Sequence, residues 1–95
     1  MVKIHLYAYA VLREILGSNE LEVSTQAKTV GEVIEVLAER YSPAFKETLI
    51  DSDSKALKRS YRIFVNGRDI EFLDMLKTQI GEGDKLVFFP PFAGG

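Results

Sequence analysis

The C-terminal end of the chain carries the most distinctive arrangement of residues, FFPPFAGG over positions 88–95. Pro90 and Pro91 have no amide hydrogen, so they cannot continue a hydrogen-bonded strand, and they direct the chain outward as a stiff segment. Phe92 follows them as a single apolar side chain. This order predicts that a strand ends at residue 89 and that an exposed tail begins at residue 90.

The last three residues, Ala93, Gly94 and Gly95, have almost no side chain. A chain end this thin fits a narrow channel in another protein, and glycine adopts backbone angles that other residues avoid. The carboxylate at the end of such a chain could therefore enter the active site of another protein. Residues 90–93 are expected to contact the partner.

Other groups that could do chemistry are few. The chain has no cysteine, which excludes disulfides, zinc–thiolate sites and a cysteine nucleophile. The single histidine, His5, has no other candidate ligand near it in sequence, so we expect it on the outer face of a strand. Asp51 and Asp53 lack the remaining ligands of a calcium loop, and solvation explains them. The sequence therefore predicts no metal site and no cofactor bound by the chain itself.

Composition and charge exclude several classes of protein. The 95 residues are 46% hydrophobic with a net charge of -2, which is typical of one globular domain. Basic residues are scattered, apart from a short group that we expect in a solvated loop: Lys55, Lys58, Arg59 and Arg62. We expect no nucleic-acid surface. No apolar run approaches the ~20 residues of a membrane span and no secretory start is visible, so a cytoplasmic protein is expected.

Alternating apolar residues predict the strands that position the tail. The first strand is expected over residues 2–9, with Val2, Ile4, Leu6 and Ala8 facing the core. Helical turns at 10–16 and a strand at 20–24 follow. Later strands are expected at 61–65, around Ile70 after an Asn-Gly turn, and at 85–89, with one helical turn at 73–76. The last strand is the most apolar, which predicts a central place in the sheet.

One helix is clearly indicated. Thr29 and Glu32 have the spacing of a capping box, and an apolar stripe follows at three- and four-residue steps: Val30, Val33, Ile34, Leu37, Ala38 and Tyr41. Pro43 ends this helix. Phe45, Leu49 and Ile50 are expected in a short amphipathic turn that covers the core, before an exposed loop at 51–55.

The element order predicts the fold. One main helix packed on one face of a mixed sheet of about five strands is the β-grasp arrangement of the α+β class. The first and last strands are expected side by side in the middle. We predict one domain over residues 1–89 and an exposed tail over residues 90–95.

Three aromatic residues are expected on the sheet face away from the helix. Neighbours on a strand point to opposite faces, so either Phe88 or Phe89 is expected to be buried. We predict that Phe89, together with Tyr7 and Phe64, lies on the outer face. An exposed apolar patch there would bind a partner protein.

The whole chain resembles the MoaD/ThiS family of ubiquitin-like sulfur carriers, and most closely the MoaD type, the small subunit of molybdopterin synthase. The resemblance rests on FFPPFAGG and the preceding GEGDKLV, on KIHLYAYAVLREILG at the start, on the helix TVGEVIEVLAERY and on the turn VNGRDI. The chain departs from the shortest carriers by extra length around residues 51–61.

This resemblance implies a mechanism. An E1-like enzyme would adenylate the Gly95 carboxylate using ATP and magnesium, and sulfur from a persulfide donor would displace AMP to leave a thiocarboxylate. In molybdopterin synthesis, that sulfur would be passed to the precursor inside the large subunit, in a heterotetramer of two small and two large subunits. The carrier alone would contribute no catalytic side chain: in the scheme that the resemblance implies, Gly95 is the reacting residue and Gly94 supplies the slim approach.

Three other functions remain open at this stage. The same chemistry could serve thiazole synthesis or tRNA thiolation. The chain could be a protein modifier that is attached to lysines in the manner of ubiquitin. It could also be a β-grasp binding module without covalent chemistry.

Overall fold

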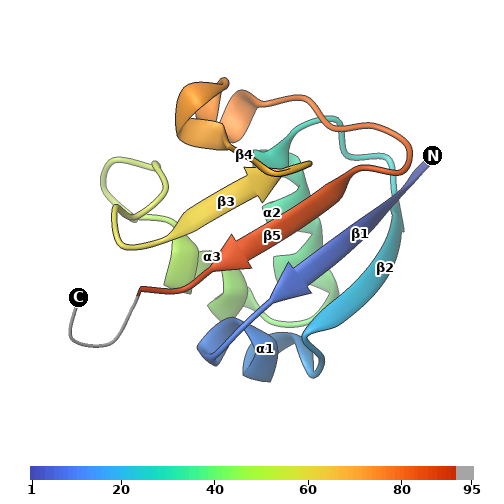
Figure 1. Ribbon diagram of the computed structural model, residues 1–95. Helices are drawn as coiled ribbons and strands as arrows, with labels where there is room; N and C mark the ends of the chain where they lie inside the picture. Colours follow the sequence, from blue (N-terminus) through green and yellow to red (C-terminus); the bar gives the residue numbers. More distant parts are fainter. Residues whose placement is uncertain (92–95) are drawn as a thin grey trace.

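The computed structural model describes residues 1–91 and has the predicted β-grasp architecture (Figure 1). The five-stranded sheet has the order β2-β1-β5-β3-β4. Its strands are β1 (Val2–Ala8), β2 (Glu20–Thr25), β3 (Arg62–Val65), β4 (Arg68–Asp69) and β5 (Lys85–Phe89). β1 and β5 are parallel, and the other pairs are antiparallel. The first and last strands are therefore adjacent in the middle of the sheet, which confirms the prediction.

Helices cover one face of the sheet, and the described residues contain more of them than the sequence indicated. They are α1 (Val11–Leu16), α2 (Val30–Arg40) and α3 (Pro43–Leu49), with the 3₁₀ turns η1 (Ile70–Phe72) and η2 (Met75–Lys77). α2 and α3 lie behind the sheet in Figure 1.

The expected short turn after α2 is in fact the helix α3. Pro43 occupies its first turn, and the Ser42 hydroxyl accepts a hydrogen bond from the Ala44 amide at 3.1 Å. Proline ends one helix and begins the next because its fixed φ suits a first turn, where no amide donor is needed. Phe45 and Leu49 anchor α3 in the core with no exposed surface.

The core lies between the sheet and the helices. Ile4, Leu6 and Ala8 of β1 are buried as the alternation predicts, whereas Val2 is only partly buried. Phe45 of α3 meets Phe88 of β5 edge to face, with ring centroids 5.5 Å apart. This contact joins the helical layer to the strand that leads into the tail.

The start of α2 forms the predicted cap with one difference. The Thr29 hydroxyl accepts from the Glu32 amide at 3.2 Å, but the Glu32 carboxylate reaches back to the Lys28 amide, at 2.9 Å, and not to the amide of Thr29. Gly31 lies against η2, where a Cβ atom would come within 3.2 Å of the Leu76 carbonyl oxygen. The glycine therefore permits the close packing of the two elements.

The segment after β3 differs from the prediction. Asn66-Gly67 forms the expected tight turn, with positive φ at both residues. The next strand, β4, ends at Asp69, and Ile70 is the buried first residue of η1. Asp69 stops the strand because its side chain accepts from the Glu71 amide at 2.9 Å and caps η1. The helical turn expected at 73–76 is instead η2, displaced to residues 75–77.

At the other end of β5, the turn at 81–84 is fastened to its neighbours. Asp84 accepts hydrogen bonds from the Gly81 amide at 2.7 Å and from the Asn66 side chain at 2.9 Å. Its carbonyl accepts from the His5 amide at 2.9 Å. These bonds fix the start of β5, so the register at its far end is set as well.

Within the part of the chain that the structure describes, no helix has the length and apolar character needed to cross a membrane.

Candidate tail-exit site

The tail leaves the sheet from its central region. β5 ends at Phe89, whose register partner is Arg62 at the start of β3. Pro90 is half-buried and Pro91 is exposed. The end of β5 lies at the left of the sheet in Figure 1, beside the loop that precedes β3. Four predicted site residues lie outside the described residues: Phe92, Ala93, Gly94 and Gly95.

The predicted aromatic face lies beside this exit. Tyr7, Phe64 and Phe89 are each half-buried on the side of the sheet opposite the helices, whereas Phe88 is fully buried beneath it. Phe64 meets Phe89 edge to face, with ring centroids 5.4 Å apart. Tyr7 and Phe64 both pair in register with Val87 from opposite sides. The predicted placement of all three aromatic residues is therefore confirmed, and we call them, with Tyr9, the aromatic face.

Sequence reasoning did not include Tyr9 among the site residues. Its ring stacks on Phe89 at a centroid distance of 5.9 Å with planes 22° apart, and 39% of its surface is exposed. The signal was available, because Tyr9 has the same strand parity as Tyr7.

Polar residues hold Tyr7 in place at the edge of the aromatic face. Its hydroxyl lies 3.4 Å from Glu20 on β2, and the ammonium group of Lys85 lies 5.0 Å from the ring centroid. The negative charge of Glu20 raises the pKa of the Tyr7 hydroxyl, because it disfavours a second negative charge nearby.

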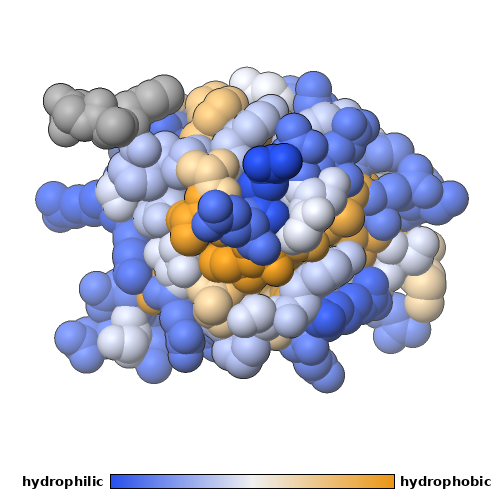
Figure 2. Space-filling model, turned by 90° about the horizontal axis from the view of Figure 1, so that it is seen from below, coloured by the Kyte–Doolittle hydropathy of each residue, from blue (hydrophilic) through white to orange (hydrophobic). Residues whose placement is uncertain are grey.

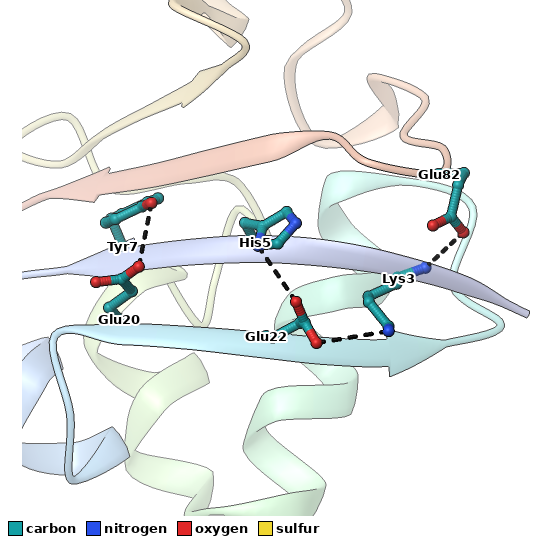
Figure 3. A network of polar contacts seen from close by, with 6 residues as sticks. All are labelled: Lys3, His5, Tyr7, Glu20, Glu22 and Glu82. Carbon is teal, nitrogen blue, oxygen red and sulfur yellow. Dashed lines mark hydrogen bonds and ion pairs between the residues drawn. The ribbon is translucent and has the colours of Figure 1, made fainter.

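Farther along β1 and β2, the same side of the sheet is charged (Figure 3). Glu22 lies 3.6 Å from the Lys3 ammonium and 3.7 Å from His5 Nδ1. The Lys3 amide donates to Glu82 at 2.9 Å. His5 therefore lies on the outer face of β1, as predicted. No group of three or more His, Cys, Asp or Glu side chains in residues 1–91 could hold a metal ion.

Two further surface features are a groove and an apolar area. A groove of about 810 Å³ between α2, α3 and the following loop carries both signs of charge, including Glu35, Lys46 and Lys58. Seen from below, the molecule shows an apolar area bordered by hydrophilic residues (Figure 2). α1 is the lowest element in Figure 1 and therefore lies on this side of the molecule.

Comparison with known proteins decides the family. The sequence profile of the ThiS family matches residues 7–95, which include the aromatic face and the whole tail. The chain belongs to the ThiS family. The relatives below are named as sulfur carriers and as small archaeal modifier proteins, and the chain belongs to a family of ubiquitin-like sulfur carriers and modifiers.

Two relatives represent these two descriptions. The sulfur carrier protein CysO of Mycobacterium tuberculosis is 37% identical over 86 residues, which cover 90% of each chain. Small archaeal modifier protein 3 of Haloferax volcanii is 30% identical over 96 residues, which cover 99% of this chain and 100% of the relative.

Solved structures agree with the fold. Small archaeal modifier protein 1 of Methanosarcina acetivorans has a TM-score of 0.81 and 32% identity, covering 100% of this chain and 98% of its own. CysO of Amycolatopsis orientalis, solved in a complex with BexX, has a TM-score of 0.80 and 28% identity, covering 97% and 99%. A putative molybdopterin converting factor subunit 1 of Pyrococcus furiosus has a TM-score of 0.74 and 25% identity, covering 97% and 100%.

The sequence identities test whether the chain is of the expected MoaD type. Identity to CysO of Mycobacterium tuberculosis and to the two archaeal modifiers named above exceeds the 25% identity to the molybdopterin protein. The family prediction is confirmed, and the comparisons do not single out the MoaD type within it.

Proposed function

We propose that this ThiS-family protein is a sulfur carrier whose Gly95 carboxylate is adenylated by an E1-like enzyme and then converted to a thiocarboxylate. The observation that carries the proposal is the course of β5. This strand is anchored in the middle of the sheet and ends at Phe89, and the chain then passes through Pro90 and the exposed Pro91. A firmly held strand that leads into an exposed segment suits a terminus that another enzyme must reach.

The proposed chemistry needs only the carboxylate from this chain. A carboxylate is a poor electrophile until one oxygen becomes part of a leaving group, so the enzyme would use ATP and magnesium to form the acyl adenylate and release pyrophosphate. Hydrosulfide would then attack the carbonyl carbon and expel AMP, leaving the thiocarboxylate. With a persulfide donor, the acyl disulfide formed first would be cleaved by a thiol. The terminal sulfur is then a nucleophile that a second enzyme can use.

Three residues of the aromatic face, Tyr7, Phe64 and Phe89, would dock the activating enzyme. Tyr7, Phe64 and Phe89 surround Val87 next to the exit, and residues 90–93 would continue the contact into the enzyme's channel. Aromatic residues at the centre of an interface contribute much of its binding energy. The complex of CysO with BexX shows a protein of similar fold bound to a second protein, which supports this part of the proposal.

Intact-mass measurement tests the carrier function directly. The purified chain is incubated with an E1-like enzyme, ATP, magnesium and sulfide, and we expect a mass increase equal to the difference between sulfur and oxygen. A matched control carries one additional alanine after Gly95 and should remain unchanged. A modified control, or an unmodified wild-type chain with each E1-like enzyme of its source, contradicts the proposal.

Protein modification is the second candidate, and the two modifiers among the relatives support it. The same acyl adenylate would then be attacked by a lysine amine, which forms an isopeptide bond and releases AMP. A tagged chain expressed in its host would give adducts of high mass that resist denaturation and contain Gly95 linked to lysine. Absence of such adducts while the thiocarboxylate forms would exclude this function.

The recipient of the sulfur remains a separate part of the proposal. The resemblance to the MoaD type and the likeness to the molybdopterin converting factor subunit support delivery to molybdopterin synthase. In that case, a large subunit should copurify as a heterotetramer, and the thiocarboxylate form should produce dithiolene in its presence. Copurification with a different sulfur-using enzyme, such as one for thiazole or tRNA thiolation, would redirect the pathway while leaving the carrier chemistry intact.

A further inference from the structure

The side-chain contact between Tyr9 and Phe89 continues the β1–β5 pairing beyond the end of the strand. The parallel register runs from His5 opposite Lys85 to Ala8 opposite Phe88. β1 ends at Ala8, so Phe89 has a strand neighbour only on its β3 side, at Arg62. On the β1 side, the ring of Tyr9 stacks on the ring of Phe89.

The backbone of Tyr9 is held by the helix that follows it. Ala10 has a φ of 55°, which turns the chain sharply, and the Leu12 amide donates to the Tyr9 carbonyl at 3.2 Å. Leu12 and Leu16 anchor α1 in the core, with exposed fractions of 0% and 5%. The position of the Tyr9 ring is therefore fixed by buried residues, although the ring itself is partly exposed.

Phe89 is thus held between two rings, by stacking with Tyr9 and by an edge contact with Phe64. The next residue is Pro90, whose ring restricts the backbone angle and transmits the direction of Phe89 to the following chain. We propose that Tyr9 is a positioning residue, which fixes the direction in which the chain leaves β5 at Phe89 and Pro90. This inference rests on the proposed function.

The physical reason is the orientation of the reacting group. After docking, the carboxylate must meet the α-phosphate of ATP in one geometry, and a small displacement of a reacting group can lower the rate by one or two orders of magnitude. Loss of the Tyr9 ring would leave docking through Phe64 and Tyr7 in place but widen the range of directions at Phe89. The rate within the complex should therefore fall more than the affinity.

The first measurement uses the carrier alone. In the Tyr9→Ala variant, hydrogen exchange of the Phe89 amide should accelerate about three- to tenfold, the effect expected for losing one aromatic pair. The Leu86 amide, in the middle of the same strand, should change by less than about twofold because its pairing on both sides is retained. Tyr9→Phe keeps the stack and should exchange like the wild type.

The second measurement follows adenylation by ATP–pyrophosphate exchange with the E1-like enzyme. Tyr9→Ala should lower kcat about tenfold or more while KM for the carrier stays within about twofold. Tyr9→Phe should restore kcat. The matched control is Tyr41→Ala, because Tyr41 has a similar exposed fraction, 45% against 39%, but lies at the end of α2. That variant should behave like the wild type.

Several outcomes overturn the inference. If the hydrogen exchange of the Phe89 amide is unchanged in Tyr9→Ala, the stack does not stabilise the end of β5. If KM rises while kcat is unchanged, Tyr9 is a docking contact. An equal loss of kcat in Tyr41→Ala shows a general effect on the fold. If the wild-type chain is not adenylated at all, the proposed function itself fails, and the hydrogen-exchange data still show whether the Tyr9 ring stabilises the end of β5.

Discussion

Phe88 and Phe89 are neighbours in sequence, but their side chains lie on opposite faces of the sheet. Phe88 is fully buried and contacts Phe45. Phe89 is half-buried on the open side of the sheet, the side opposite the helices, and contacts Phe64 and Tyr9. The difference follows from strand geometry, because successive side chains point to opposite faces. Substitutions at the two kinds of position should therefore be separable by measuring stability and binding independently.

Phe45→Ala tests the buried side of this arrangement. It removes the ring against Phe88 and should lower the free energy of unfolding by about 3–5 kcal/mol, because the cavity cannot be filled by its neighbours. Urea denaturation measures this value. Phe72→Ala is the matched control, since Phe72 is 82% exposed, and it should change stability by less than about 0.5 kcal/mol. A similar loss in both variants would contradict the described packing.

Asp51 gives a prediction for pH dependence. Its carboxylate accepts from the amides of Ser54 and Asp53, each at 2.9 Å, and these hydrogen bonds lower its pKa by favouring the charged form. A carboxylate with a lowered folded-state pKa contributes stability above its ordinary pKa, and this contribution is lost as pH falls through the folded-state pKa.

Asp51→Ala should therefore lower the melting temperature at neutral pH. The difference in melting temperature between this variant and the wild type should become smaller as the pH falls through the acidic range. Thermal denaturation across a pH series measures both quantities. Asp53→Ala serves as the control, because it removes a second carboxylate from the same loop. A difference between wild type and Asp51→Ala that is constant with pH would show that the charge of Asp51 is unimportant.

At the scale of elements, the start of α2 is where several segments meet. Thr29 caps the helix and also pairs with Gln79, and the Val30 amide donates to the Thr78 carbonyl at 3.0 Å. Gly31, in the next position, allows close approach of η2. The helix that covers the sheet is thus positioned at its first turn.

Thr29→Ala removes the hydroxyl that accepts from the Glu32 amide. The free energy of unfolding should fall by about 1 kcal/mol, the usual effect of losing an N-terminal cap. Thr29→Ser retains an acceptor and should recover most of this loss. Urea denaturation of both variants makes the comparison, and equal values for the alanine and serine variants would show that the cap does not contribute.

Gly31→Ala separates helix propensity from packing. Alanine in place of glycine within a helix ordinarily adds about 1 kcal/mol of stability. Here the new Cβ would lie 3.2 Å from the Leu76 carbonyl oxygen and 3.4 Å from Leu76 Cβ, so this gain should be absent. Chemical denaturation measures the free energy of unfolding of the variant. An increase of about 1 kcal/mol over the wild type would mean that η2 moves aside easily.

At the scale of the whole molecule, helices and the aromatic face lie on opposite sides of one sheet. The helical side buries the core, while the open side holds the aromatic residues next to the exit of the tail and charged pairs farther along β1. The side that buries the core and the side proposed for docking are therefore separate.

Phe64→Asp tests the aromatic face as a docking surface. A carboxylate in the middle of an apolar interface should raise the dissociation constant for the activating enzyme at least about tenfold. Calorimetric titration measures binding, and circular dichroism should show an unchanged fold. Phe72→Asp introduces the same charge at an exposed aromatic position on η1 and should bind normally. Equal binding by both variants would place docking elsewhere.

The sequence alone determined the elements that depend on local patterns. Alternation gave β1, β2, β3 and β5 and the faces of most of their residues, the cap spacing gave the start of α2, and the proline pair gave the end of β5. These succeed because strand geometry, capping and proline chemistry act over a few residues.

Only the tertiary structure decided what depends on contacts distant in sequence. The helix α3 requires the core pocket that receives Phe45, η1 requires the bond of Asp69 to its own turn and to Arg62 at 2.7 Å, and Gly31 is explained only by η2. The stack of Tyr9 on Phe89 joins residues 80 positions apart in the chain, which the parallel pairing of β1 with β5 brings together. No local pattern contains that information, because it arises when the two ends of the chain become neighbours.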